Sequence, residues 1–147
     1  MSSLAALVSQ SLDSPAVVEF FLSQPATLAH RRQGRLGLQG IRSLASKEDG
    51  YEVVHCRGRI ETIFLYLAPR DGSSPFRGEL AGGLAVTDSR EDVSRKLGPP
   101  TRSGAGDPAG GWPWDRYDSE VLCLHIASGE SGVGLRMLTL MAVDVAP

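Results

Sequence analysis

Histidine and cysteine are the residues of this sequence that could carry nucleophilic or metal chemistry, and both are few. The chain of 147 residues holds three histidines and two cysteines. Hydrolysis by a serine nucleophile needs a histidine within hydrogen-bond reach, and in one common fold a GxSxG turn between a strand and a helix. The sequence has no GxSxG, and Ser131 in SGESG falls on an expected hairpin turn. A hydrolytic site is not predicted.

Two short pairs could instead suggest a metal site. His55-Cys56 and Cys123-x-His125 occupy similar expected strands in the two halves of the chain. Neighbouring residues of a strand point to opposite faces, so His55 and Cys56 diverge, whereas Cys123 and His125 share a face. All four cannot meet without a bulge, and a buried cysteine commonly acts as a small apolar residue. No metal site is predicted.

Cofactor and nucleic-acid binding have equally weak signals. The glycine-rich stretches at Gly82-Gly83 and 104–111 match neither GxGxxG nor GxxxxGK[ST], so no cofactor is predicted. The basic residues Arg31, Arg32 and Arg35 lack interleaved aromatics, which indicates a solvated basic turn rather than a nucleic-acid site.

The segment WPWDRYD carries the strongest functional signal. Tryptophan, tyrosine and arginine dominate protein–protein hot spots, and nearby acids add steering and specificity. The predicted partner-binding residues are Trp112, Trp114, Asp115, Arg116, Tyr117 and Asp118. The alternative is that Trp114 and Tyr117 are core residues of a strand. In a mixed arrangement, Trp114 and Tyr117 face one way while Arg116 and Asp118 face the other.

A capped helix over residues 89–98 anchors the predicted architecture. Ser89 is a good N-cap, and Asp92 completes a short form of the capping box. Val93 and Leu97 form one apolar stripe, and Gly98 followed by two prolines ends the helix. A helix this short needs a sheet to pack on.

Other stretches predict an earlier helix and two hairpins. Ser14-Pro15 starts a helix that places Val17, Val18, Phe21 and Leu22 on one face. Residues 50–67 form a hairpin around Arg57-Gly58-Arg59, and residues 120–143 form a second around SGESGVG. Leu36–Ala45 carries apolar residues without a clean period and is read as a strand.

The two halves agree at an offset of 75 residues. Asp13, Ser14, Val18, Leu22 and Pro25 meet Asp88, Ser89, Val93, Leu97 and Pro100, and Ile63 and Leu65 meet Leu138 and Leu140. This predicts an α+β fold of two tandem helix-plus-β-hairpin units, with the helices packed on one face of an antiparallel sheet. The units span residues 1–70 and 84–147, joined by a linker at 71–83, within one compact domain. The other face of the sheet is solvated or given to a partner.

Composition and charge exclude several classes. Net charge is −2 and no stretch approaches the roughly 20 apolar residues that span a bilayer, so neither nucleic-acid nor membrane binding is predicted. The N-terminus lacks the basic region and apolar core of a secretory signal, and the two cysteines form no disulfide pattern. A cytoplasmic location is expected.

The stretch GGLAVTDSREDVSRKLGPP resembles a known bacterial signature. Its Gly83, Ser89, Val93, Leu97, Gly98 and Pro100 are similar to the pattern of β-lactamase-inhibitor-like folds and of outer-membrane lipoproteins of the SmpA/OmlA type. With PFRGEL and TIFLY, the chain also resembles small bacterial immunity-type proteins. The resemblance implies a tandem helix-plus-sheet fold and carries over no functional residue.

We therefore expect a non-enzymatic protein-binding module, an immunity or inhibitor protein that neutralises a bacterial toxin by steric occlusion. One alternative is a small enzyme or a ligand- or metal-binding domain with a pocket lined by His55 or His125. Another is an assembly or scaffold protein. The sequence does not predict an oligomeric state.

Overall fold

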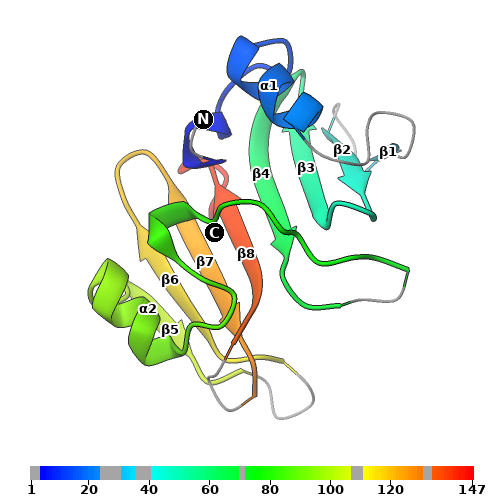
Figure 1. Ribbon diagram of the computed structural model, residues 1–147. Helices are drawn as coiled ribbons and strands as arrows, with labels where there is room; N and C mark the ends of the chain where they lie inside the picture. The colour runs from blue at the N-terminus through cyan, green and yellow to red at the C-terminus, as the bar shows by residue number, and fades with distance from the viewer. Residues whose placement is uncertain (1–3, 24–30, 36–40, 70–71, 107–110, 131–133) are drawn as a thin grey trace.

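The protein is built on one antiparallel β-sheet of eight strands (Figure 1). The computed structural model describes residues 4–23, 31–35, 41–69, 72–106, 111–130 and 134–147. The strands are β1 (Arg31–Arg35), β2 (Ile41–Ser46), β3 (Tyr51–Cys56), β4 (Arg59–Tyr66), β5 (Arg102–Gly104), β6 (Trp114–Asp118), β7 (Cys123–Ser128) and β8 (Leu135–Met141). Their order across the sheet is β1-β2-β3-β4-β8-β7-β6-β5.

The predicted fold of two helix-plus-hairpin units is wrong. Each half of the chain contributes four consecutive strands, and the halves merge because β4 pairs antiparallel with β8 at the centre of the sheet. The residues that agreed between the halves, Ile63 and Leu65 with Leu138 and Leu140, lie on these two central strands. The result is a mostly-β protein with a single continuous sheet.

The strands that the sequence predicted poorly or not at all lie toward the edges of the sheet. β1 runs through Arg31–Arg35, where a basic turn was expected, and His30 lies outside the described residues. β2 begins at Ile41, so only the last part of the expected strand 36–45 can be compared. β5 is only three residues long.

Helix α2 (Arg90–Leu97) confirms the capping prediction. The Ser89 side chain accepts from the backbone N–H of Asp92, and the Asp92 side chain accepts from the backbone N–H of Ser89, which completes the capping box. Gly98 closes the helix at a φ of 84°, a conformation that favours glycine.

Helix α1 (Pro15–Ser23) begins at the predicted residue but presents a different face. Val17 is fully buried, and Phe20 packs edge-on against Tyr51 with ring centroids 5.3 Å apart. Val18 and Leu22, which were expected on the buried face, are 41% and 67% exposed. The side chain of Phe21 lies outside the described residues.

Both predicted hairpins are confirmed. β3 and β4 pair around Arg57 and Gly58, which have φ angles of 52° and 80°, as a two-residue turn of this kind requires. β7 and β8 also pair antiparallel.

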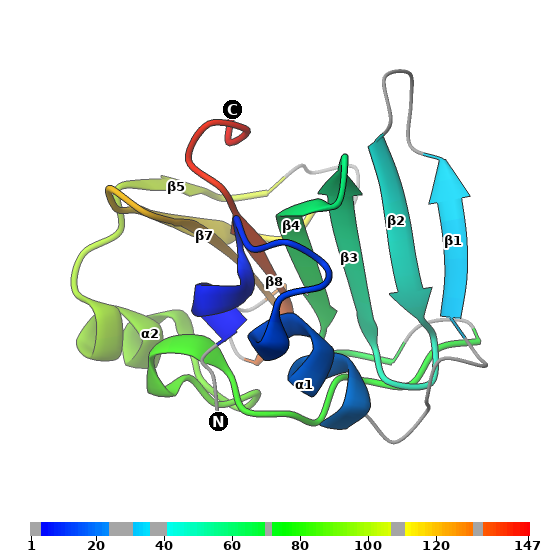
Figure 2. The ribbon, with the colours of Figure 1, turned by 90° about the horizontal axis from the view of Figure 1, so that it is seen from above.

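One side of the sheet carries the helices and the core. Figure 2 shows α1 and α2 on the same side of the sheet and the C-terminal end on the other side. The core between helices and sheet includes Val17, Ile63, Val93, Ile126 and Leu138. The stretch expected to be a linker contributes Phe76 and Leu80 to this core, and Leu84 directly after it also belongs to the core. The two halves therefore share one hydrophobic core.

Candidate binding face on the helix-free side of the sheet

The side of the sheet away from α1 and α2 is called here the helix-free face. Paired residues of neighbouring antiparallel strands point to the same side, so the register defines its members. A first row across the sheet is Tyr66, Met137, Ala127, Trp114 and Gly104; a second is Glu52, Phe64, Thr139, His125, Arg116 and Arg102; a third is Val54, Thr62, Met141, Cys123 and Asp118. These rows bring together residues that are far apart in the sequence.

Two aromatic pairs lie on this face. The rings of Phe64 and Tyr66 on β4 are nearly parallel, at 8°, with centroids 6.4 Å apart. Across β8, the rings of Trp114 and His125 stack with centroids 5.1 Å apart. Each of these four side chains is partly exposed, so they form two flat platforms that remain in contact with solvent.

A hydrogen bond and a close approach to a glycine hold the platforms in place. The Tyr66 hydroxyl donates to Glu52 Oε2 at 3.0 Å, which fixes that ring beside Phe64. The Trp114 indole lies across Gly104 on the neighbouring strand, in the space that a β-carbon there would fill. Burial lowers the pKa of His125, with a further contribution from the charge of Arg116, so this ring is neutral at pH 7.

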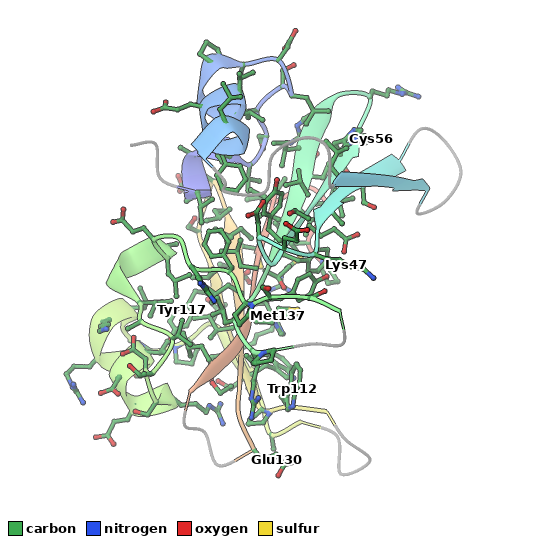
Figure 3. The ribbon with its side chains drawn as sticks, turned by 45° about the vertical axis from the view of Figure 1, so that its right-hand side comes forward. Lys47, Cys56, Trp112, Tyr117, Glu130 and Met137 are labelled. Carbon is green, nitrogen blue, oxygen red and sulfur yellow. The ribbon has the colours of Figure 1, made fainter. Side chains whose placement is uncertain are left out.

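Methionines connect the two platforms. Met137 pairs with Tyr66 on one side and with Ala127 on the other, and Met141 pairs with Thr62 and Cys123. Both methionines are partly exposed. Figure 3 shows Met137 near the middle of the molecule and Trp112 and Glu130 toward one end of it, with Cys56 toward the opposite end. Trp112, just before β6, is 41% exposed and is the most open aromatic of the predicted segment.

Arg116 and Asp118 carry the charge at one end of the helix-free face. Arg116 Nε donates to Asp118 Oδ1 at 2.8 Å, and Arg116 Nη1 donates to the main-chain oxygen of Pro147 at 2.6 Å. The hydrogen bond with Asp118 raises the pKa of Arg116, and hydrogen bonds from Cys123 and then Arg116 lower the pKa of Asp118. Arg102 lies directly across from Arg116 on β5 and is exposed.

Asp115 and Tyr117 lie on the other side of the sheet, toward α2. Asp115 is 5% exposed; it accepts from Arg90 Nη2 at 2.7 Å and Nε at 2.9 Å, and from Ser103 Oγ at 2.6 Å. Arg90 holds the pKa of Asp115 below its usual range. The Tyr117 hydroxyl donates to the Gly98 main-chain oxygen at 3.1 Å, and burial raises its pKa. Both residues fasten α2 to the sheet.

The six predicted partner-binding residues are thus divided between two sides of the sheet. Trp114, Arg116 and Asp118 lie on the helix-free face, Asp115 and Tyr117 lie under α2, and Trp112 precedes the strand. The expected mixture of Trp114 with Tyr117 is wrong, because residues three apart in a regular strand point to opposite sides.

The histidines and cysteines do not form one site. His55 pairs with the core residue Ile60, whereas His125 lies on the helix-free face. Cys56 and Cys123 share that face but lie on β3 and β7, three strand spacings apart, or about 14 Å. Among the residues that the structure describes, no group of three or more His, Cys, Asp or Glu could hold a metal ion.

Sequence reasoning missed most of the helix-free face. Phe64, Tyr66, Met137 and Met141 were read only as parts of hairpins. Phe64 and Tyr66 alternate with buried residues along β4, whereas β8 is less regular because Arg136 is exposed and Thr139 is buried. The alternation in β4 is the signal that could have identified Phe64 and Tyr66. It could not show which aromatic pairs meet, because that depends on the β4–β8 register.

Comparisons with known proteins give a likeness of fold. No protein-family model and no curated protein matches the sequence. The structure resembles an extracellular protein containing an SCP domain from Bacillus anthracis, with a TM-score of 0.62 and 8% sequence identity. The matched region covers 97% of this chain and 46% of that one. It also resembles a cysteine-rich secretory protein from Staphylococcus aureus (TM-score 0.60, 8% identity), with coverage of 97% and 47%. The chain spans about half the length of these two proteins.

A weaker likeness, with a TM-score of 0.45 and 16% identity, is to the DUF4309 family protein YjgB of Bacillus subtilis, with coverage of 86% of this chain and 76% of that one. The two likenesses with TM-scores of 0.62 and 0.60 correct two expectations. The fold is similar to about half of an SCP-domain-containing extracellular protein and of a cysteine-rich secretory protein, so the resemblance to β-lactamase-inhibitor-like folds, SmpA/OmlA lipoproteins and immunity proteins was wrong. The expected cytoplasmic location is also contradicted, since both neighbours are extracellular or secretory proteins. Among the described residues, no helix is long and apolar enough to cross a membrane.

Proposed function

We propose that this protein is a non-enzymatic binding module that holds a protein partner against the helix-free face of strands β4, β8, β7 and β6. One observation carries the proposal. The register places two aromatic platforms, Phe64–Tyr66 and Trp114–His125, on a sheet face that neither α1 nor α2 covers.

The composition of this face suits a protein partner. Aromatic rings bury a large area while ordering few rotatable bonds, and methionines adapt to an irregular surface. The charged residues Glu52, Arg116 and Asp118 lie among and beside them, which supports specificity as well as affinity. Binding would act by covering the partner's surface, with the rings as anchors.

Affinity capture with matched variants tests the proposal. The protein is immobilised and exposed to extracts and culture medium of its source, and retained proteins are compared between variants. The double substitution Phe64→Ala/Trp114→Ala removes one ring from each platform. Because truncation of a hot-spot aromatic costs about 2 kcal/mol or more, we expect at least an approximately 30-fold loss of affinity for any retained partner.

The control removes a similar apolar area from the opposite side of the molecule. Val18 and Leu22 of α1 are 41% and 67% exposed, so Val18→Ala/Leu22→Ala should leave capture unchanged. Circular dichroism and thermal melting confirm that both variants stay folded. A partner that is retained equally by the Phe64/Trp114 variant, or lost only with the α1 variant, would overturn the proposal.

A further inference from the structure

The end of the helix-free face near Arg116 is covered by the chain itself. After β8, the backbone N–H of Ala142 still donates to Glu61 O on β4, at 2.8 Å. From Val143 on, the backbone hydrogen bonds of the described residues stay within the tail: Val145 N and Ala146 N both donate to Ala142 O. Figure 2 shows this tail on the side of the sheet opposite the helices.

Two arginine side chains hold the tail. Arg59 forms a two-point contact with Asp144, at 3.1 and 3.2 Å, and its Nη2 also donates to Ser9 Oγ at 3.0 Å. At the other end Arg116 Nη1 donates to the Pro147 main-chain oxygen at 2.6 Å. The Arg59–Asp144 pair is weak, because its side chains are 39% and 65% exposed to water.

Cys123 lies beside Arg116, the residue that holds the end of the tail. By register, Cys123 belongs to the helix-free face, yet it is only 2% exposed. Burial, with a contribution from Asp118, raises the pKa of its thiol to about 11. The neighbouring Arg116 is also mostly covered, with a side-chain exposure of 13%, although it lies on a face without helices.

We propose that residues 143–147 form a displaceable strap over the Cys123 end of the helix-free face, and that the partner segment replacing the strap presents a carboxylate to Arg116 and Arg102. The strap shows the kind of group that Arg116 binds, because Arg116 donates a hydrogen bond to an oxygen atom of the strap. Arg102 and Arg116 face each other across β5 and β6, and among the described residues Asp118 is the acid that pairs with Arg116. An extended acidic segment matches this local excess of positive charge.

The proposal that residues 143–147 form a strap does not rest on the proposed function. The proposal that an acidic partner segment replaces the strap does rest on it. The first experiment therefore measures the strap alone, as the rate at which an aromatic disulfide reagent labels Cys123 at pH 8. All variants carry Cys56→Ser so that Cys123 is the reporter. Asp144→Ala should raise the rate about two- to fivefold, as expected for loss of a weak exposed ion pair.

Deletion of residues 143–147 should raise the labelling rate at least about tenfold, because an exposed thiol returns toward its ordinary pKa of about 8.5. The control Glu91→Ala removes an exposed carboxylate on α2 and should not change the rate. If the deletion and Asp144→Ala both label at the parent rate while the protein stays folded, the strap is overturned.

The second experiment measures the replacement. A capped tetraglutamate peptide added to the deletion variant should slow labelling of Cys123, whereas a capped tetralysine peptide should not. Arg116→Gln in the same variant should remove the protection. If neither peptide slows the labelling of Cys123, or if both slow it equally, the proposal of an acidic partner segment is refuted. The strap and the binding face are tested by the other experiments.

Discussion

Asp115 offers the sharpest test of how the sheet and α2 are joined. The substitution Asp115→Asn keeps the shape of the side chain and removes its charge, so Arg90 loses its counterion. Breaking a buried ion pair from one side typically costs about 3–5 kcal/mol. Since the Arg90 side chain is 34% exposed while that of Asp115 is 7% exposed, water recovers part of that loss, and we expect about 2–3 kcal/mol.

Denaturant unfolding measures this loss, and thermal melting should show a drop of about 4–12 °C. Its pH dependence has a definite sign. Because Arg90 lowers the pKa of folded Asp115, the stabilisation is fully present above the unfolded pKa of about 3.9 and is lost as pH falls through the folded pKa. The difference between wild type and Asp115→Asn should therefore be largest near neutral pH and shrink below about pH 4.

A matched control lies on the same strand. Asp118 is exposed and pairs with Arg116, so Asp118→Asn should destabilise the protein clearly less than Asp115→Asn does. In a double-mutant cycle, Arg90→Ala and Asp115→Asn should be strongly non-additive. A loss for Asp115→Asn within about 0.5 kcal/mol of zero, or additivity with Arg90→Ala, would refute the role of Asp115 as a brace.

Two further substitutions test local packing. Gly104→Ala should destabilise the protein by about 1–3 kcal/mol and change tryptophan fluorescence, because its β-carbon would collide with the Trp114 indole; an unchanged spectrum would contradict the stacking geometry. Ser89→Ala should cost about 1 kcal/mol in denaturant unfolding through loss of the α2 cap, and a loss below about 0.3 kcal/mol would argue against the capping box.

The sequence predicted elements whose causes are local. The cap of α2 depends on Ser89, Asp92 and Gly98 within ten residues, and the β3–β4 turn depends on Arg57 and Gly58. Such signals act on neighbouring backbone groups, so they can be read without knowing the fold.

Features that depend on long-range pairing could not be read in this way. The arginine- and glycine-rich β1 has weak strand propensity, and its pairing with β2 makes it a strand. The offset of 75 residues located similar segments, but could not show that β4 and β8 pair with each other and so form one sheet.

The candidate site was predicted in part for the same reason. Trp114 and Arg116 were identified from residue type, whereas His125, Phe64 and Met137, which share their face of the sheet, come from other strands. The assignment of Asp115 to partner binding ignored α2, whose Arg90 lies 25 residues earlier in the chain and pairs with it.

Site-specific photo-crosslinking shows directly whether the helix-free face contacts a protein partner. A photoreactive phenylalanine analogue is placed at Phe64 on the helix-free face or at Leu22 on α1, and each protein is irradiated in its source cells. We expect a discrete crosslinked protein from position 64 and none from position 22. The same product from both positions, or a product from position 22 alone, would contradict it.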